Sequence, residues 1–278
     1  MNELLKYLQK QLAAEYTNGE ISILNNIIIR KIASIELTTI LQKEEFRLTD
    51  KQFDKFKRIV ARLQKHEPIQ YILREGNFYG MDFFVNKNVM IPRPETEELV
   101  EWVLHDNKSG SVLDIGTGSG CIAITLAKKR PELQVWALDS SSQAISVAHK
   151  NAKLFKVNIH FLKQDILQIP HFKQKWDIIV SNPPYIPTKE QKMLHKSVKD
   201  FEPHSALFVA DDTPVIFYEK IIQFAKNQLS TNGKIYFEIH KDFGNEIKKL
   251  LKTNGFKNII LKKDISGHDR MVYGEMNY

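Results

Sequence analysis

The chain has 278 residues, a length that allows one large domain or a medium-sized domain joined to a smaller one. Hydrophobic residues make up 42% and charged residues 26%, as in ordinary globular proteins, and no apolar run approaches the roughly 18 residues that suggest a membrane span. The net charge of +7 is compatible with an anionic partner, but the lysines are spread without a block of like charges, so the charge alone names no partner.

The first 75 residues are predicted to be helical and contain no group of catalytic side chains. Leu4, Leu8 and Leu12 fall on one face of the first predicted helix, and residues 21–41 form a second helix. Residues 49–52 match a capping box that begins a third helix, which Pro68 is expected to end. The start of the chain resembles an amphipathic helix and not a signal peptide, so we expect a cytoplasmic protein. This small helical domain is either structural or a substrate-docking module.

Residues 76–91 change character and are expected to link two domains. Residues 78–85 followed by 86–91 are predicted to form two strands around a polar turn, which gives a β-hairpin. The following run, Ile-Pro-Arg-Pro-Glu-Thr-Glu at 91–97, breaks this pattern. Glu95 or Thr96 is expected to cap a helix that extends to about residue 104.

Residues 92–278 are predicted to form an α/β domain, because strands and helices alternate from Ser111 onward. This alternation favours a mostly parallel sheet with helices on both faces. The predicted strands are 112–115, 134–138, 159–162, 177–181, 234–239, 259–261 and 271–273. The predicted helices are 121–129, 143–154, 214–229 and 243–251. The single cysteine, Cys121, excludes an intrachain disulfide and a zinc cluster built from cysteines, and we expect it to pack in the core.

A glycine-rich loop, 114–120, joins the first strand of this domain to its first helix. Glycines let a ligand approach the backbone closely, and the helix start attracts anionic groups. The dinucleotide-binding fingerprint would place a glycine where Cys121 stands. Asp139 ends the next strand, where an acidic group commonly binds ribose hydroxyls. Together these features resemble the class I S-adenosylmethionine-dependent methyltransferases, whose fold is Rossmann-like, and the resemblance places Asp165 and Ile166 beside the adenine.

The run Asn-Pro-Pro-Tyr at 182–185 directly follows the apolar strand 177–181. Proline cannot donate to a sheet ladder, so the run forms a stiff corner at the carboxyl end of a strand, where ligands bind in open α/β sheets. It resembles the motif of methyltransferases that act on planar nitrogens, which include adenine-amine and glutamine side-chain enzymes. The Asn182 side-chain oxygen and the Pro183 carbonyl are expected to accept the two N–H groups of such a nitrogen, with Tyr185 packed against the planar group.

The order of several motifs separates these two acceptors. The run at 91–97, the glycine loop, the corner at 182–185 and the segment 264–270 closely resemble the bacterial release-factor glutamine methyltransferases, the HemK/PrmC family. That family methylates the glutamine of the Gly-Gly-Gln motif in class I peptide chain release factors and leaves S-adenosylhomocysteine. Arg74, Ile166 and His240 depart from the family pattern. The adenine methyltransferases of DNA or RNA remain the alternative, although no long insertion suits base recognition.

The resemblance assigns a role to each site residue and includes no metal ion. It implies catalytic roles for Asn182, Pro183 and Tyr185. It implies that the cofactor is bound by Gly116, Thr117, Gly118, Ser119, Gly120, Asp139, Asp165, Ile166 and Asn182. It implies that the substrate is bound by Asn182, Pro183, Pro184, Tyr185, Arg93 and Glu95. We expect a monomer whose protein substrate is a release factor and which binds neither a membrane nor a specific nucleic-acid sequence.

Overall fold

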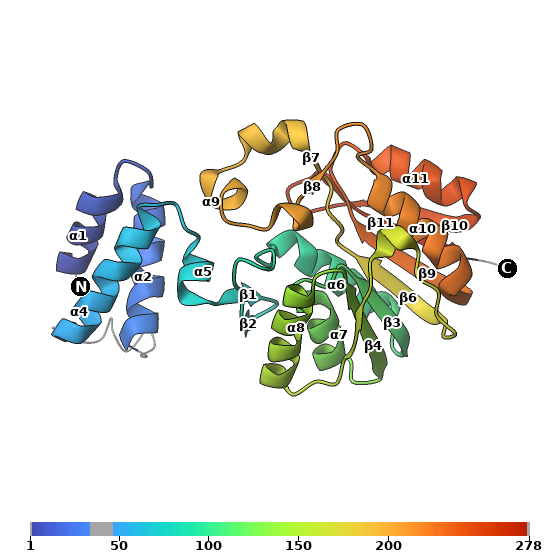
Figure 1. Ribbon diagram of the computed structural model, residues 1–278, viewed down its shortest axis with the longest axis horizontal. Coiled ribbons are helices and arrows are strands. Elements are labelled where there is room, and N and C mark those ends of the chain that lie inside the picture. The colour runs from blue at the N-terminus through green and yellow to red at the C-terminus, as the bar shows by residue number, and fades with distance from the viewer. Residues whose placement is uncertain (1, 34–46, 277–278) are drawn as a thin grey trace. The chain divides into compact units, whose positions relative to one another are not determined.

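The computed structural model describes residues 2–33 and 47–276 (Figure 1). The chain forms two compact units. The smaller combines Met1–Arg74 with Lys196–Phe201, and the larger combines Glu75–His195 with Glu202–Tyr278. Among the described residues, no helix has both the length and the apolar character needed to cross a membrane.

The smaller unit is a set of short helices around an aliphatic core. Its helices are α1 (Asn2–Leu12), α2 (Asn18–Ala33), α4 (Asp50–Leu63), α5 (Ile69–Leu73) and α9 (Lys196–Lys199). The capping box predicted at Thr49 and Gln52 is confirmed, because each side chain bonds the backbone of the other. Pro68 precedes α5 and does not itself end α4, which stops at Leu63. The last part of the predicted helix 21–41 lies outside the described residues.

The larger unit begins with a β-hairpin that is shorter than predicted. Its strands are β1 (Gly76–Phe78) and β2 (Met81–Phe83). The predicted first strand, 78–85, is wrong, because the chain already reverses at Tyr79 and Gly80, which have φ of 52° and 72°. Two consecutive positive φ values are the backbone of a tight hairpin turn, and a tyrosine is an unusual residue to supply one. Residues 84–91 therefore form no strand and run as an irregular segment.

The larger unit also contains a seven-stranded sheet, with the strand order β10-β11-β9-β6-β3-β4-β5. Its strands are β3 (Gly110–Ile115), β4 (Leu133–Asp139), β5 (His160–Lys163), β6 (Trp176–Ser181), β9 (Leu229–Glu238), β10 (Phe256–Lys263) and β11 (Asp269–Met276). The first five are parallel, and β11 is antiparallel to both of its neighbours. The predicted mostly parallel sheet is confirmed.

Helices cover both faces of this sheet (Figure 1). They are α6 (Pro94–Asp106), α7 (Cys121–Lys129) and α8 (Ser142–Phe155) on one face, with α10 (Ile216–Gln228) and α11 (Gly244–Thr253) on the other. Successive strand residues point to opposite faces, so Val112 enters the first core and Leu113 the second. Short elements between the last parallel strands were not predicted. They are η1 (Ile166–Gln168), β7 (Ile186–Pro187), η2 (Thr188–Met193), η3 (His204–Ala206) and β8 (Phe208–Val209).

The order of the strands reverses between β3 and β6. The chain runs outward from β3 through β4 to β5, and it then returns to β6 and continues to β9 on the other side. The register aligns Ile115 with Ser181 and Ser181 with Phe237. The residues that follow these positions therefore meet at one edge of the sheet, at the switch point where α/β folds bind their ligands.

Candidate active site

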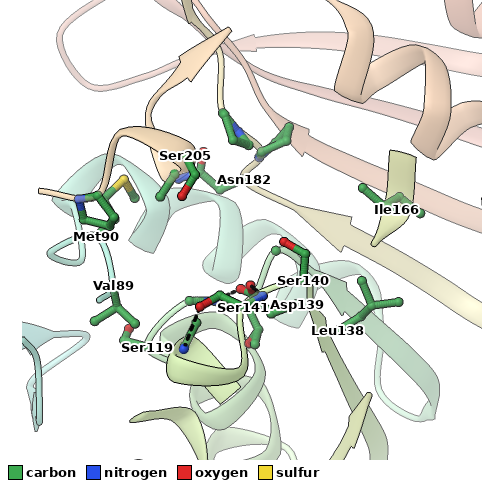
Figure 2. A pocket seen from close by; sticks show the side chains of 18 of the residues that line it. Val89, Met90, Ser119, Leu138, Asp139, Ser140, Ser141, Ile166, Asn182 and Ser205 are labelled. Carbon is green, nitrogen blue, oxygen red and sulfur yellow. Dashed lines mark hydrogen bonds between the residues drawn. The ribbon is translucent and has the colours of Figure 1, made fainter. Parts of the chain in front are cut away.

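A cavity of about 420 Å³ opens at this edge of the larger unit. Figure 2 shows Asn182 and Ser205 above Ser119, Asp139 and Ser141. Ten predicted site residues line the cavity, namely Gly116, Thr117, Gly118, Ser119, Asp139, Asp165, Ile166, Asn182, Pro183 and Pro184. The remaining four, Gly120, Tyr185, Arg93 and Glu95, are not among its lining residues. Cys121 packs against the core as expected and also lines the cavity.

The glycine loop leaves space for a ligand at Gly116. This residue has φ of +76°, and a Cβ at this position would meet no atom within 4 Å. Gly120 has a different role, because its Cβ would lie 2.8 Å from Ile124 Cδ1 and 3.2 Å from Ala148 Cβ. The first glycine therefore provides room on the cavity side, while the last allows α7 and α8 to pack closely.

Asp139 joins the loop to the end of β4. Its Oδ2 accepts the Gly118 N–H at 2.9 Å, and its Oδ1 accepts the Ser141 N–H at 2.9 Å. Each carboxylate oxygen keeps a further lone pair, so the group is able to accept ribose hydroxyls as well. Burial raises the pKa of Asp139, and these backbone bonds oppose that rise.

The opposite end of the cavity suits a planar purine. Ile166 is buried and lies near Leu138, Phe217 and Ile221 in the apolar part of the lining (Figure 2). Asp165 begins η1, and its Oδ1 accepts the Leu167 N–H at 2.9 Å. Its second oxygen remains for an exocyclic amino group. Apolar side chains together with one carboxylate are suited to adenine, so the residues fit the cofactor that the sequence predicts.

Asp114 lies beneath the loop, fully buried. Its Oδ2 accepts the Thr117 hydroxyl at 2.6 Å, whereas its Oδ1 has no hydrogen-bond partner among the described residues. Burial raises its pKa from an ordinary value of 3.8 to about 7. A buried oxygen without a donor, below a loop that lines a cavity, is suited to balance a positively charged ligand group nearby.

This raised pKa predicts a pH dependence of stability. The folded protein binds the Asp114 proton more tightly than the unfolded chain does. The contribution of this proton to the free energy of unfolding is therefore full below about pH 4 and is lost as the pH rises to about 7. In urea unfolding of the cofactor-free protein, the free energy of unfolding of the wild type should fall by on the order of 3 kcal/mol between about pH 4 and pH 8 because of Asp114. Asp114→Asn should abolish this fall. Equal pH dependences for the variant and the wild type would contradict the assignment.

The acceptor end is organised around Asn182. Its Nδ2 donates to Thr96 Oγ1 at 3.1 Å, and the Thr96 hydroxyl donates to Glu238 Oε2 at 2.6 Å. Glu238 is buried at the end of β9, and its Oε1 accepts the Tyr185 hydroxyl at 3.0 Å. Burial raises the pKa of Glu238, and both hydroxyl donors oppose that rise. The Nδ2 bond is the only hydrogen bond that the Asn182 carboxamide makes to a described residue, so its oxygen remains available to a ligand.

Tyr185 is held outside the cavity lining. Its hydroxyl is bound to Glu238, and its ring lies 6.0 Å from that of His240 in an edge-on arrangement. Burial raises the pKa of Tyr185, so its hydroxyl stays protonated as a donor. Its contact with a planar substrate stays a prediction.

Arg93 holds the wall of the cavity together. Its Nη2 lies 2.5 Å from Oε1 of Glu202, a buried carboxylate whose Oε2 accepts the Ile91 N–H at 3.1 Å. Residues 203–206, which follow Glu202, supply Pro203, Ser205 and Ala206 to the lining. Direct substrate contacts of Arg93 and Glu95 stay predictions.

Sequence reasoning missed how Thr96 and Asn151 organise this site. Thr96 was expected to cap a helix, but Arg93 occupies the N-cap without a side-chain bond, and the Thr96 hydroxyl contacts Glu238. The Glu95 cap is likewise wrong. Asn151 of α8 donates to the carbonyls of Phe84 and Ser119, both at 2.9 Å, and so joins the irregular segment to the glycine loop. A lone asparagine within a helix gives no sequence signal for such a bridge.

Comparisons with known proteins agree with this geometry. Residues 95–215 match the methyltransferase small domain, and residues 3–73 match the PrmC N-terminal domain. A release factor glutamine methyltransferase from Flavobacterium psychrophilum is 45% identical, with 94% of each chain covered. Another, from Bacteroides thetaiotaomicron, is 36% identical over 98% of this chain and 99% of its own. Among solved structures, a Pyrococcus furiosus methyltransferase has a TM-score of 0.53 at 16% identity, covering 78% of this chain and 98% of that one, a likeness of fold alone.

Proposed function

The chain belongs to the release factor glutamine methyltransferase family, and we propose that it methylates the glutamine side chain of the Gly-Gly-Gln motif in class I release factors, using S-adenosylmethionine. The observation that carries this proposal is the placement of the Asn182 carboxamide. It lies at the cavity that also contains the glycine loop and Asp139, with its oxygen left available.

The cofactor would be held by residues that follow or end three strands, β3, β4 and β5. The loop residues 116–119 would bind its amino-acid part, Asp139 its ribose, and Asp165 with Ile166 its adenine. When bound, S-adenosylmethionine supplies a methyl group on a positively charged sulfur. The Asp114 carboxylate, once ionised, would add negative charge below the loop and so favour this cation.

The substrate nitrogen is a poor nucleophile, because its lone pair is delocalised into the amide. Asn182 Oδ1 and the Pro183 carbonyl would accept its two N–H groups and hold it in position. These acceptors also stabilise the positive charge that develops on nitrogen in the transition state. The methylated nitrogen is strongly acidic and loses its proton to water, so the chain needs no strong base.

The smaller unit would serve the protein substrate. Its match to the PrmC N-terminal domain supports a docking role. We propose that the protein acts as a monomer in the cytoplasm. A sedimentation experiment that finds a stable dimer would contradict the proposal that the protein is a monomer.

Label transfer tests the function directly. The protein is incubated with methyl-labelled S-adenosylmethionine and either a purified class I release factor, the same factor with its motif glutamine replaced by alanine, or DNA and RNA. We expect label on the unmodified release factor alone. Label that persists after the glutamine is replaced, or that appears on nucleic acid, would overturn the proposal and favour the adenine enzymes.

A further inference from the structure

The Asn182 carboxamide has two different ends. Its oxygen accepts hydrogen bonds, whereas its NH₂ group donates them. A half-turn about the last side-chain bond would exchange the two ends with little change in shape. Only one orientation presents the oxygen to an N–H group of the substrate amide, so a neighbouring group must select that orientation.

The hydrogen bonds around Thr96 make that selection. Glu238 lies at the end of β9, where the register places Phe237 beside Ser181, and its carboxylate is fully buried. Burial favours the neutral form of this carboxylate, but hydroxyl donors from Thr96 at 2.6 Å and Tyr185 at 3.0 Å favour its charged form, which can only accept. Arg270 supplies a positive charge nearby and is itself fixed by Asp264 at 2.9 Å.

The single hydroxyl proton of Thr96 is therefore committed to Glu238. Only lone pairs remain on Thr96 Oγ1 to meet Asn182, so the group at 3.1 Å must be the donating Nδ2. The opposite end of the carboxamide, Oδ1, then faces away from Thr96.

We propose that Thr96, supported by Glu238, is a positioning residue that fixes the carboxamide so that Asn182 Oδ1 faces the substrate amide. The inference rests on the proposed function, because it names what prepares the acceptor end of that same site. Thr96 touches neither reacting atom in this role and acts only through Asn182.

Thr96→Val keeps the shape of the side chain and removes its hydroxyl. We expect kcat on the release factor to fall about 10- to 100-fold, because the carboxamide loses its fixed orientation, while the dissociation constant of S-adenosylmethionine changes less than about twofold. Thr96→Ser restores the hydroxyl and should keep kcat within about threefold of the wild type. Thr125→Val is a matched control, since Thr125 is buried in α7 and its hydroxyl has no hydrogen-bond partner in the part of the chain that the structure describes, and it should leave kcat unchanged.

A double-variant cycle separates positioning from a general packing effect. If Thr96 acts through Asn182, Thr96→Val adds no further loss of kcat in an Asn182→Ala background. An equal further loss there, a wild-type kcat for Thr96→Val, or failure of serine to restore kcat would overturn the inference. Should the valine variant fold poorly, Glu238→Gln replaces it, because an amide can donate to Thr96 and reverse the hydrogen bonds, and it should lower kcat similarly. Wild-type protein that transfers no label contradicts the proposed function instead.

Discussion

Asn182→Ala should lower kcat on a release factor about 100- to 1000-fold, the typical effect of removing one preorganised group that stabilises transition-state charge. The variant loses the oxygen that would accept the glutamine N–H, while Pro183 and Pro184 keep the backbone corner stiff. The fold should be retained, because Thr96 is the only described residue to which the lost side chain is hydrogen-bonded. Steady-state methylation and thermal unfolding measure both quantities.

Asn227→Ala provides the comparison for this prediction. Asn227 lies exposed near the end of α10 and does not line the cavity, so its replacement should leave kcat unchanged. A kcat for Asn182→Ala within a few-fold of the wild type would show that the carboxamide does not hold the substrate.

Asp139→Ala should weaken the binding of S-adenosylhomocysteine at least about 100-fold in calorimetric titration. The variant loses the acceptor for the ribose and also leaves the N–H groups of Gly118 and Ser141 without their partner. Hydrogen bonds to a charged group contribute about 1.5 to 3 kcal/mol each, and 2.7 kcal/mol corresponds to a hundredfold change in affinity.

Asp177→Ala is the matched control for this carboxylate. Asp177 also accepts a backbone N–H, that of Ser111 at 2.8 Å, but it lies near the start of β6 and does not line the cavity. Its replacement should lower stability and leave the affinity for S-adenosylhomocysteine unchanged. Equal losses of affinity in both variants would indicate general destabilisation in place of a ribose contact.

The central sheet and the cofactor end could be predicted because their signals are local. An apolar run followed by glycines or prolines marks the end of a strand, and parallel strands bring such ends to one edge. Gly116, Asp139, Ile166 and Asn182 therefore meet at the cavity, as the order of motifs suggested. Their individual roles toward cofactor and substrate stay predictions.

The parts that could not be predicted depend on strand register and on contacts between residues far apart in the sequence. Glu238 reaches Thr96 only because β9 pairs with β6 so that Phe237 faces Ser181, which no local pattern encodes. Threonine is a residue type that commonly caps helices, but the Thr96 hydroxyl instead donates to the buried Glu238 carboxylate of β9. The hairpin was misplaced because Tyr79 adopts a positive φ that is normally left to glycine or asparagine.

The ion pair between Arg93 and Glu202 has a consequence for how such enzymes diversify. In the proposed role, the Asn182 oxygen would require only an N–H group on a planar substrate, and a nucleobase amine would meet that requirement as well as glutamine does. Discrimination would then come from the walls, which are the irregular segment 87–92 and the segment 203–206 that contains η3, joined through Arg93 and Glu202. Since these walls lie outside the sheet, we expect that changes confined to the two segments would alter the choice of acceptor and leave the residues proposed for methyl transfer in place.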